Sequence, residues 1–464
     1  MLDTFRVPDA IAGERGPVGA IVRPDGRGAR ILWPNAPVVP RKHVQLGDIR
    51  VCARVVEEPT GRTLLAGQPV TGWRRETPVT SAAGEILGWT LRGDDGSLFL
   101  PFDPEEAMAT LIAEEYQGSV SSSAKSVARR LYYAGRFLVP RSVILQLRRQ
   151  LAQAKDYTAA FPRWPAEPSL HDLFSLVLTE VERVAGEPLP MLAPWPQGYE
   201  WAFVISHDVE RSAGLANVGK MRGIETELGF RSAWYFVPER DYRVDDDLVA
   251  SLTADGFEVG LHGLHHDGRD LNPHYFDERI GRMLDYARRW GAVGFRAPAT
   301  QRVRHLIAKI GLEYDSSYAD VATFEPQSGG TCSLLPFTIG DVVELPITFE
   351  QDHTLLEVLA LTPAAAADNW RAKAAFIRER QGLGMLLAHP DYMLADDRLA
   401  AYRSFLESIA EMSAWHALPR DVSRWWRRRA ETALVRDGAG GWVAVGPAAD
   451  EARVVVGLGT AAQR

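Results

Sequence analysis

The sequence predicts an α/β fold in residues 201–415, as a (β/α) barrel or a doubly wound sheet. From residue 202 onward, short apolar runs alternate regularly with helical patterns. The runs are AFVIS (202–206), SAWYFV (232–237), FEVGLH (257–262), VGFRAP (293–298), VVELP (342–346) and GMLLAH (384–389). Regular strand–helix alternation favours parallel strands joined by crossover helices.

The region before residue 103 predicts a separate β-rich unit. Its apolar runs at 19–22, 30–33, 49–56, 85–91 and 97–102 are typical of strands. The stretches between them, such as PDGRG (24–28) and EEPTGR (57–62), contain the Gly and Pro residues of turns. We therefore expect residues 1–102 to form a β-rich N-terminal unit.

Helical spacing follows from residue 103, beginning with DPEEAMATLIAEEY and continuing through 122–135, 140–153 and 169–185. The Pro-rich residues 186–201 predict a linker or a wrapping segment. Residues 416–464 predict a C-terminal helix and a small β tail. The expected organisation is thus 1–102, 103–200, 201–415 and 416–464.

Composition narrows the classes of partner. The 464 residues carry a formal net charge of −8, and basic residues are scattered apart from RRR at 427–429, which predicts a solvated helix face. Nucleic-acid binding calls for a concentrated basic face, so no nucleic-acid partner is expected. No stretch approaches the roughly 18 apolar residues of a membrane span, and no secretory signal opens the chain. We expect a cytoplasmic protein, of an oligomeric state that the sequence leaves open.

Polar side chains end several predicted strands, which is where chemistry gathers in α/β folds. These residues are His207, Asp208 and Glu210; His262, His265 and His266; Arg296; Asp315 and Tyr318; and His389 and Asp391. One polar strand end carries little information, but five in one domain predict a site.

The spacing of two histidines indicates a metal. His262 and His266 are four residues apart, so they share a face and converge on one ion if the strand turns into a helical start. Two imidazoles and one carboxylate are a common set for a catalytic divalent metal. A second carboxylate can then take a proton from water, and a separate histidine can protonate a leaving group.

These segments resemble the polysaccharide deacetylase family, also called carbohydrate esterase family 4 or the NodB-homology domain. VISHDVE (204–210) is similar to the first family motif in its Asp-Val-Asp branch, and HGLHH (262–266) has the two histidines of the second. RAP (296–298), the segment around Asp315, and MLLAHPD (385–391) are similar to the remaining three. The resemblance covers residues 200–395 and implies a distorted (β/α) barrel with about seven strands.

The resemblance also implies roles for the motif residues. His262 and His266 would hold the metal with Glu210 or Asp208, and Asp208 would be the catalytic base. The other implied roles are orientation of the base by Arg296, catalysis by Asp315, general acid for His389, and substrate binding for Pro298 and Tyr318. Asp391 is a weaker candidate as the residue that orients His389. We expect His265 beside the site or at the surface, and His207 in a structural or substrate-side role.

Three residues depart from the family pattern. Glu210 stands where Asp is usual, Gly263 replaces the usual Ser or Thr, and His207 replaces an aromatic residue. Aromatic residues are more often core than sugar platforms, so we expect Trp201, Trp234, Tyr235, Trp425 and Trp426 to be mostly buried. Cys52 and Cys332 lie far apart and predict small buried side chains rather than a disulfide or a metal site.

The implied activity is hydrolysis of an N- or O-linked acetyl group on a carbohydrate or glycan precursor. The expected cofactor is Zn²⁺, with Co²⁺ or Ni²⁺ as alternatives. A cytoplasmic enzyme would meet a sugar nucleotide, a lipid-linked precursor or a small glycan. Two other hypotheses stay open: a C–N hydrolase acting on a non-sugar amide, and an inactive barrel that serves as a glycan-binding or scaffold protein.

Overall fold

The computed structural model describes residues 12–14, 16–23, 27–117, 146, 149–150, 152, 160–438 and 440–457. The helices predicted at 122–135 and 140–153 fall outside these residues, apart from 146, 149, 150 and 152. The chain divides into two compact units. The first comprises Met1–Ser121, Glu167–Ala193 and Arg428–Arg464, and the second comprises Ser122–Ala166 and Pro194–Arg427.

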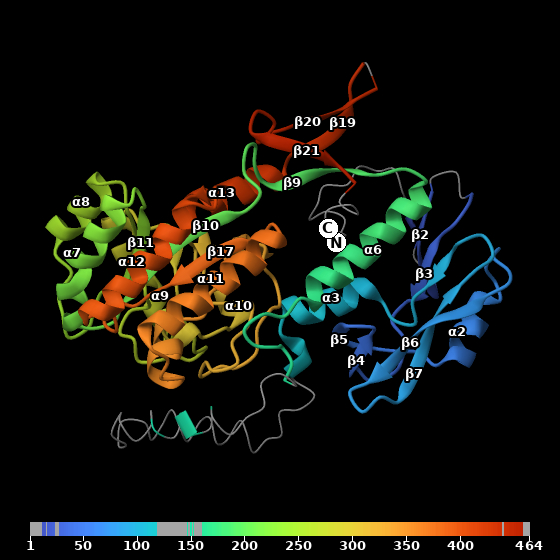
Figure 1. Ribbon diagram of the computed structural model, residues 1–464, viewed down its shortest axis with the longest axis horizontal. Helices are drawn as coiled ribbons and strands as arrows, with labels where there is room; N and C mark the ends of the chain where they lie inside the picture. The colour runs from blue at the N-terminus through green and yellow to red at the C-terminus, as the bar shows by residue number, and fades with distance from the viewer. Residues whose placement is uncertain are drawn as a thin grey trace. The chain divides into compact units, whose positions relative to one another are not determined.

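The first unit contains an eight-stranded sheet with the order β1-β2-β3-β8-β7-β6-β4-β5 (Figure 1). The strands are β1 (Ala12–Glu14), β2 (Val18–Val22), β3 (Ile31–Pro34), β4 (Lys42–Leu46), β5 (Ile49–Ala53), β6 (Arg74–Ser81), β7 (Ile86–Arg92) and β8 (Leu98–Phe99). All five predicted apolar runs contain a strand. Sequence analysis missed β1, β4 and β6. Strand β6 (RRETPVTS) is largely polar and has no continuous apolar run.

The EEPTGR stretch is a helix start rather than the predicted turn. Helix α2 (Glu58–Leu65) begins there, with a proline in its first turn, where the missing N–H would be unpaired anyway. A Cβ at Gly61 would lie 2.8 Å from Cε1 of Phe99. The glycine therefore allows the helix to approach strand β8 closely and does not form a turn.

The remaining elements of the first unit are three helices and three strands among the described residues. They are α3 (Pro104–Ile112), η1 (Glu115–Gln117), α6 (Ser169–Ala185), β19 (Ala433–Arg436), β20 (Trp442–Val445) and β21 (Ala452–Val456). Asp103 caps α3 by accepting the N–H groups of Glu105 and Glu106. The Pro-rich segment forms strand β9 (Pro190–Pro196), which pairs with β21, is buried throughout and crosses the division between the units.

The second unit is a distorted (β/α) barrel, which confirms the predicted fold class. The main path of its sheet has seven parallel strands in the order β16-β14-β13-β12-β11-β10-β17, with β15 antiparallel at one end and β18 beside β10. These strands are β10 (Ala202–Val209), β11 (Ser232–Phe236), β12 (Glu258–Leu261), β13 (Gly294–Phe295), β14 (Tyr314–Asp315), β15 (Phe337–Ile339), β16 (Val342–Glu344), β17 (Leu383–Leu387) and β18 (Trp415–His416).

The ends of this path, β16 and β17, do not pair as regular strands and are joined by Thr348. Its N–H donates to the backbone oxygen of Met385 at 3.1 Å, and its Oγ1 accepts the N–H of Met385 at 2.8 Å. The segment that makes the junction leads directly into Asp352.

Helices lie around the outside of the barrel strands (Figure 1). They are α7 (Ser212–Glu227), α8 (Asp246–Ala254), α9 (Phe276–Trp290), η2 (Pro298–Thr300), α10 (Arg304–Ile307), the π-helical η3 (His353–Val358), α11 (Pro363–Glu379), α12 (Asp396–Ala410) and α13 (Pro419–Ala430). Strand β10 is buried along all eight residues, as expected for a parallel strand covered on both faces.

The aromatic and cysteine predictions are confirmed. Trp201, Trp234, Tyr235, Trp425 and Trp426 are all buried, and so are both cysteines. The prediction of a solvated RRR face is wrong for Arg429, which is buried, whereas Arg427 and Arg428 are partly exposed. Arg427 donates to the backbone oxygens of Glu313 and Asp341, Arg428 pairs with Glu451, and the buried Arg429 donates to the backbone oxygens of Leu192 and Ala193.

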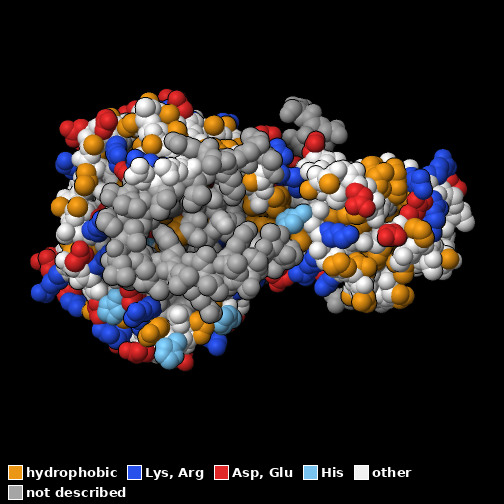
Figure 2. All heavy atoms as spheres, turned by 90° about the horizontal axis from the view of Figure 1, so that it is seen from below, with side chains coloured by type: hydrophobic (Ala, Val, Ile, Leu, Met, Phe, Trp, Pro, Cys, Tyr) orange, Lys and Arg blue, Asp and Glu red, His pale blue; other side chains and the backbone are white. Residues whose placement is uncertain are grey.

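Charge on the drawn face of the molecule is mixed. Figure 2 shows basic and acidic side chains of the described residues interspersed, without a large region of one sign. Within the described part of the chain, no helix has the length and apolar character needed to cross a bilayer.

Candidate active site

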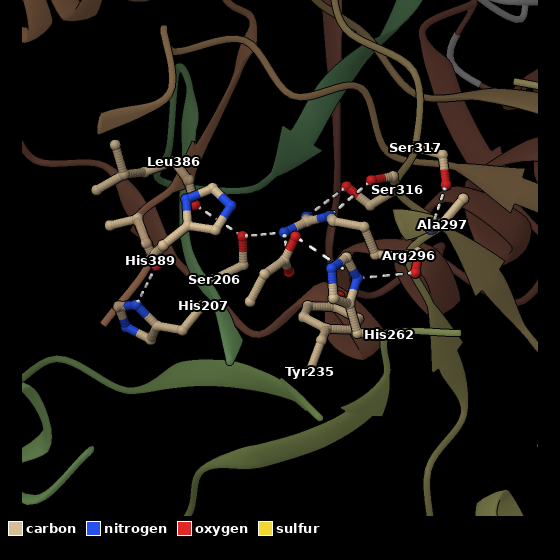
Figure 3. Close-up of polar contacts among 12 residues, drawn as sticks. Ser206, His207, Tyr235, His262, Arg296, Ala297, Ser316, Ser317, Leu386 and His389 are labelled. Atoms are coloured by element: carbon tan, nitrogen blue, oxygen red, sulfur yellow. Dashed lines mark hydrogen bonds and ion pairs between the residues drawn. The ribbon is translucent and has the colours of Figure 1, made fainter. Parts of the chain in front are cut away.

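Four parallel strands deliver polar side chains to one edge of the barrel. Asp208 lies near the end of β10, His262 directly follows β12, Arg296 directly follows β13, and His389 lies just beyond β17. Parallel strands end at the same edge of a sheet, so segments far apart in sequence meet there. Figure 3 shows the Arg296 side chain among Ser206, Ser316 and His262.

Glu210, His262 and His266 form the only group of potential metal ligands found among the described residues. One ligand atom from each lies within 4.8 Å of the others. Nε2 of His266 is 3.0 Å from Oε1 of Glu210, and the two imidazole ring centroids are 4.9 Å apart. Of the two carboxylates that the sequence left open as ligands, Glu210 is the one that lies in this group.

Asp208 lies on another side of His262. Its Oδ2 is 3.7 Å from Nδ1 of His262, and that nitrogen already lies 3.1 Å from the backbone oxygen of Arg296. Because a carbonyl oxygen only accepts, Nδ1 donates and Nε2 keeps its lone pair. Nε2 is buried and has no hydrogen-bond partner in the described structure.

This orphaned nitrogen fits a metal site. A buried polar atom without a partner is costly, and a metal ion would satisfy it while the Nδ1 hydrogen bond holds the ring in place. Burial lowers the pKa of His262 to about 4, so the imidazole is neutral at physiological pH, as a ligand must be. Burial raises the pKa of Glu210, but His266 outweighs burial and lowers the pKa well below its usual value.

The loop after β12 explains why Gly263 departs from the family motif. Gly263 has φ +70°, and a Cβ there would lie 2.3 Å from Oδ2 of Asp270 and 2.7 Å from Cγ of Pro298. His266 also has a positive φ, 54°, which is unusual for a side chain other than glycine. The loop therefore bends sharply, and this bend turns His266 back toward His262.

Arg296 is buried and holds Asp208. Its Nη1 donates to Oδ1 of Asp208 at 3.1 Å and to Oγ of Ser206 at 2.9 Å. Its Nε and Nη2 donate to the backbone oxygen and Oγ of Ser316, at 2.7 and 2.8 Å. Burial raises the pKa of Asp208, but the surrounding positive charge, which includes the Arg296 guanidinium and His389, outweighs burial, so that its pKa lies below the usual value. The carboxylate is therefore ionised.

His389 is held by Asp352, a residue that sequence analysis missed. Oδ1 of Asp352 is 2.7 Å from Nδ1 of His389, and Oδ2 accepts the His389 N–H at 2.9 Å. Burial lowers the pKa of His389, but the Asp352 carboxylate outweighs it and raises the pKa to about 10. The ring is thus an imidazolium whose Nε2–H is left for other contacts.

Asp391 does not take the place proposed for it beside His389. Its Oδ2 accepts the N–H of Glu210 at 2.9 Å, and its Oδ1 accepts the N–H of Gly214 at 3.2 Å. No local spacing distinguishes Asp352 from Asp391 as the partner of His389. The partner can be identified only from the path of the segment that joins β16 to β17.

Asp315, Pro298 and Tyr318 lie outside the group of potential ligands. Asp315 is buried, and its Oδ1 accepts a hydrogen bond from the Ser317 hydroxyl, with an O–O distance of 2.8 Å. It lies opposite Glu344 in the sheet register. Burial raises the pKa of both carboxyls, most strongly for Glu344, so the pair retains a proton. Pro298 packs against Gly263, and Tyr318 is 2% exposed within the barrel core.

The two other strand-end histidines have protein partners. Nδ1 of His207 is 2.9 Å from the backbone oxygen of Ala388, and Nε2 is 2.7 Å from Oε1 of Glu225. This buried histidine therefore joins β10, the segment after β17, and α7, which agrees with the structural alternative. His265 is partly exposed, and its Nδ1 lies 3.0 Å from the backbone oxygen of Glu239.

No protein-family model matches this chain, and none of the curated proteins matches it. Several solved structures are similar to it over about half of its length. A protein from Mycobacterium smegmatis assigned as a polysaccharide deacetylase has 22% identity and a TM-score of 0.42, with 50% of this chain and 92% of that chain covered.

Two further neighbours show the range of chemistry among these structures. The allantoinase PuuE has 14% identity and a TM-score of 0.40, with 51% and 93% of the two chains covered. A family 4 carbohydrate esterase from Streptomyces lividans has 17% identity and a TM-score of 0.31, with 47% and 91% covered. Members of the family that the sequence motifs resemble are thus among the structural neighbours of this chain.

Proposed function

We propose that this protein is a metal-dependent hydrolase that removes an N- or O-linked acetyl group from a carbohydrate. The observation that carries the proposal is that three groups of residues meet at one edge of the barrel. The Glu210–His262–His266 group can hold a metal, Asp208 is kept ionised beside Arg296, and His389 is kept protonated by Asp352.

Glu210, His262 and His266 would hold the ion through one oxygen and two nitrogens, a set that zinc accepts with positions left open. Co²⁺ and Ni²⁺ accept similar ligands. When bound, a divalent ion supplies Lewis acidity, which polarises a carbonyl oxygen and makes water easier to deprotonate. The orphaned Nε2 of His262 is the atom that most directly supports this site.

The proton transfers would fall to Asp208 and His389. Asp208 takes a proton from the water that attacks the acyl carbon, because Arg296 occupies Oδ1 and leaves Oδ2 for this task. His389 then gives the Nε2 proton to the departing amine or alkoxide as the C–N or C–O bond breaks. Its Nδ1 stays on Asp352, so the ring keeps its orientation during the transfer.

Acetate release with defined metal content tests this proposal. The full-length protein is freed of metal with a chelator and assayed on N-acetylated and O-acetylated oligosaccharides before and after addition of Zn²⁺, Co²⁺ or Ni²⁺. We expect acetate release to disappear with the chelator and return with one of the ions.

Other outcomes would favour the alternatives. Turnover of cyclic ureides or simple amides without release of acetate from any sugar would indicate a C–N hydrolase with a non-sugar substrate. A protein that takes up none of the three ions and releases no acetate would indicate a non-catalytic barrel.

A further inference from the structure

Both polar groups of the Glu210 backbone are bound by side chains from other segments. The Glu210 N–H donates to Oδ2 of Asp391, at 2.9 Å. Its backbone oxygen accepts Nε of Arg240, also at 2.9 Å. Asp391 comes from the segment after β17, and Arg240 comes from the loop after β11. The strands on both sides of β10 therefore supply the residues that fix Glu210.

Arg240 also binds the loop that carries the histidines. Its Nη1 donates to the backbone oxygens of His265, at 3.0 Å, and His266, at 3.3 Å. One guanidinium thus connects the backbone of Glu210 to the backbone of His266, two of the three potential ligands. Because His266 has a positive φ, its conformation needs support from its surroundings, and these hydrogen bonds provide some of it.

Asp391 is placed with similar specificity. Its second oxygen accepts the N–H of Gly214 in the first turn of α7, where free N–H groups favour a carboxylate. A Cβ at Gly214 would lie 2.2 Å from Oδ2 of Asp391. Glycine is therefore required at this position for the carboxylate to reach both N–H groups.

We propose that Arg240 and Asp391 are positioning residues that fix the Glu210 peptide at the distance where glutamate, and not aspartate, completes the metal site. The inference rests on the proposed function. Glutamate is longer than aspartate by one methylene, so a backbone held in place sets which of the two carboxylates reaches His266. Together Arg240 and Asp391 form a clamp on the Glu210 backbone. The clamp explains how this chain accommodates Glu where the family motif has Asp.

Zinc affinity is the direct test, because it does not depend on catalysis. The dissociation constant for Zn²⁺ would be measured by competition with a chelator on the full-length protein. We expect Arg240→Gln and Asp391→Asn each to weaken binding by about 10- to 100-fold, the usual effect of losing a residue that supports a ligand. Arg240→Lys keeps the charge and should restore part of the affinity.

Arg243→Gln is the matched control. Arg243 lies in the same loop as Arg240, but its side chain is 86% exposed and pairs only with Asp245 among the described residues, at 3.4 Å. This variant should bind Zn²⁺ as the wild type does. Circular dichroism and melting temperatures of all variants would separate a local loss of affinity from unfolding.

A double-mutant cycle tests the clamp itself. Glu210→Asp should weaken zinc binding in the wild type, because the held backbone cannot follow the shorter side chain. The same substitution should cost less in the Arg240→Gln background, where the backbone can move, so the two effects should not add. A purely structural role for Arg240 would leave them additive.

The outcomes separate this inference from the proposed function. If the wild type binds zinc and both clamp variants bind it equally well, the clamp is refuted and the metal site stands. Additive effects, or tighter binding by Glu210→Asp, would refute the selection of glutamate. A wild-type protein that binds no Zn²⁺, Co²⁺ or Ni²⁺ would refute the metal site and the clamp together.

Discussion

His262 and His389 end two strands of the same barrel, yet they are held in opposite protonation states. Nδ1 of His262 faces a backbone oxygen, and burial lowers the pKa to about 4. Nδ1 of His389 faces the Asp352 carboxylate; burial alone would lower its pKa, but the carboxylate raises the pKa to about 10. Both rings are buried, so the partner of Nδ1 decides which histidine suits a metal and which suits an acid.

The comparison also shows how much of this site depends on residues outside the motifs. The carbonyl partner of His262 belongs to Arg296, itself a motif residue. Asp352 comes from the segment after β16, in a stretch with no motif. The partner of neutral His262 is thus Arg296, which sequence analysis identified. The partner of charged His389 is Asp352, which sequence analysis did not identify.

Asp208→Asn should produce the largest effect on activity, because it removes the proposed catalytic base. We expect kcat/KM for acetate release to fall by about 10³-fold, within the range for loss of a general base, while Zn²⁺ stays bound. Steady-state kinetics and metal analysis would measure this. Asp368→Asn, at a carboxylate that is 74% exposed and pairs with Arg371, is the control. Full activity of Asp208→Asn would exclude the base role.

His207→Leu extends the comparison to a third histidine, in which both ring nitrogens have protein partners. The change leaves the buried Glu225 carboxylate without one partner, so we expect a loss of about 3 kcal/mol in the free energy of unfolding. Urea denaturation monitored by circular dichroism would measure it. A loss below about 1 kcal/mol would mean that the surrounding Tyr402 and Ser232 hydroxyls are sufficient.

Asp352→Asn should make His389 more like His262. Without the carboxylate, burial dominates and the His389 pKa falls, so the acid loses its proton at lower pH. We expect kcat/KM to fall by about 10- to 100-fold and the alkaline limb of its pH profile to move to lower pH. An unchanged alkaline limb would contradict the assignment of His389 as the acid.

The same variant makes a prediction about stability. A histidine with a raised folded-state pKa stabilises the fold fully below its unfolded value of about 6.5, and this contribution is lost as pH rises through the folded value. For His389 that value is about 10. Wild type and Asp352→Asn should therefore differ most in the free energy of unfolding at acidic to neutral pH and converge toward pH 10, as pH-dependent urea denaturation would show.

Arg424→Gln should have the smallest effect. Arg424 pairs with Glu313 at 2.8 Å, but both side chains are at least one-third exposed. Solvent screening limits such pairs to less than about 1 kcal/mol, and we expect kcat/KM to be unchanged. A large loss of activity would mean that the site depends on α13, which the hydrogen bonds of the motif residues do not indicate.

Sequence patterns predicted the barrel because parallel strands buried on both faces leave continuous apolar runs, as in β10 and β17. They also indicated the histidines and carboxylates that meet, because these residues directly follow such runs. The roles of those residues remain predictions. Asp352 and Arg240 carry no local signal, since each acts across segments far apart in sequence, and the positive φ of His266 cannot be read from its residue type.

The packing around Gly263 limits how this protein can evolve. A substitution to serine, which would bring the chain nearer to the usual family motif, would set a Cβ 2.3 Å from Asp270 and 2.7 Å from Pro298 on a backbone that disfavours any side chain. A serine could be accommodated at this position only if those neighbours changed first. The order in which substitutions at these contacting positions can be tolerated is therefore constrained by steric contact.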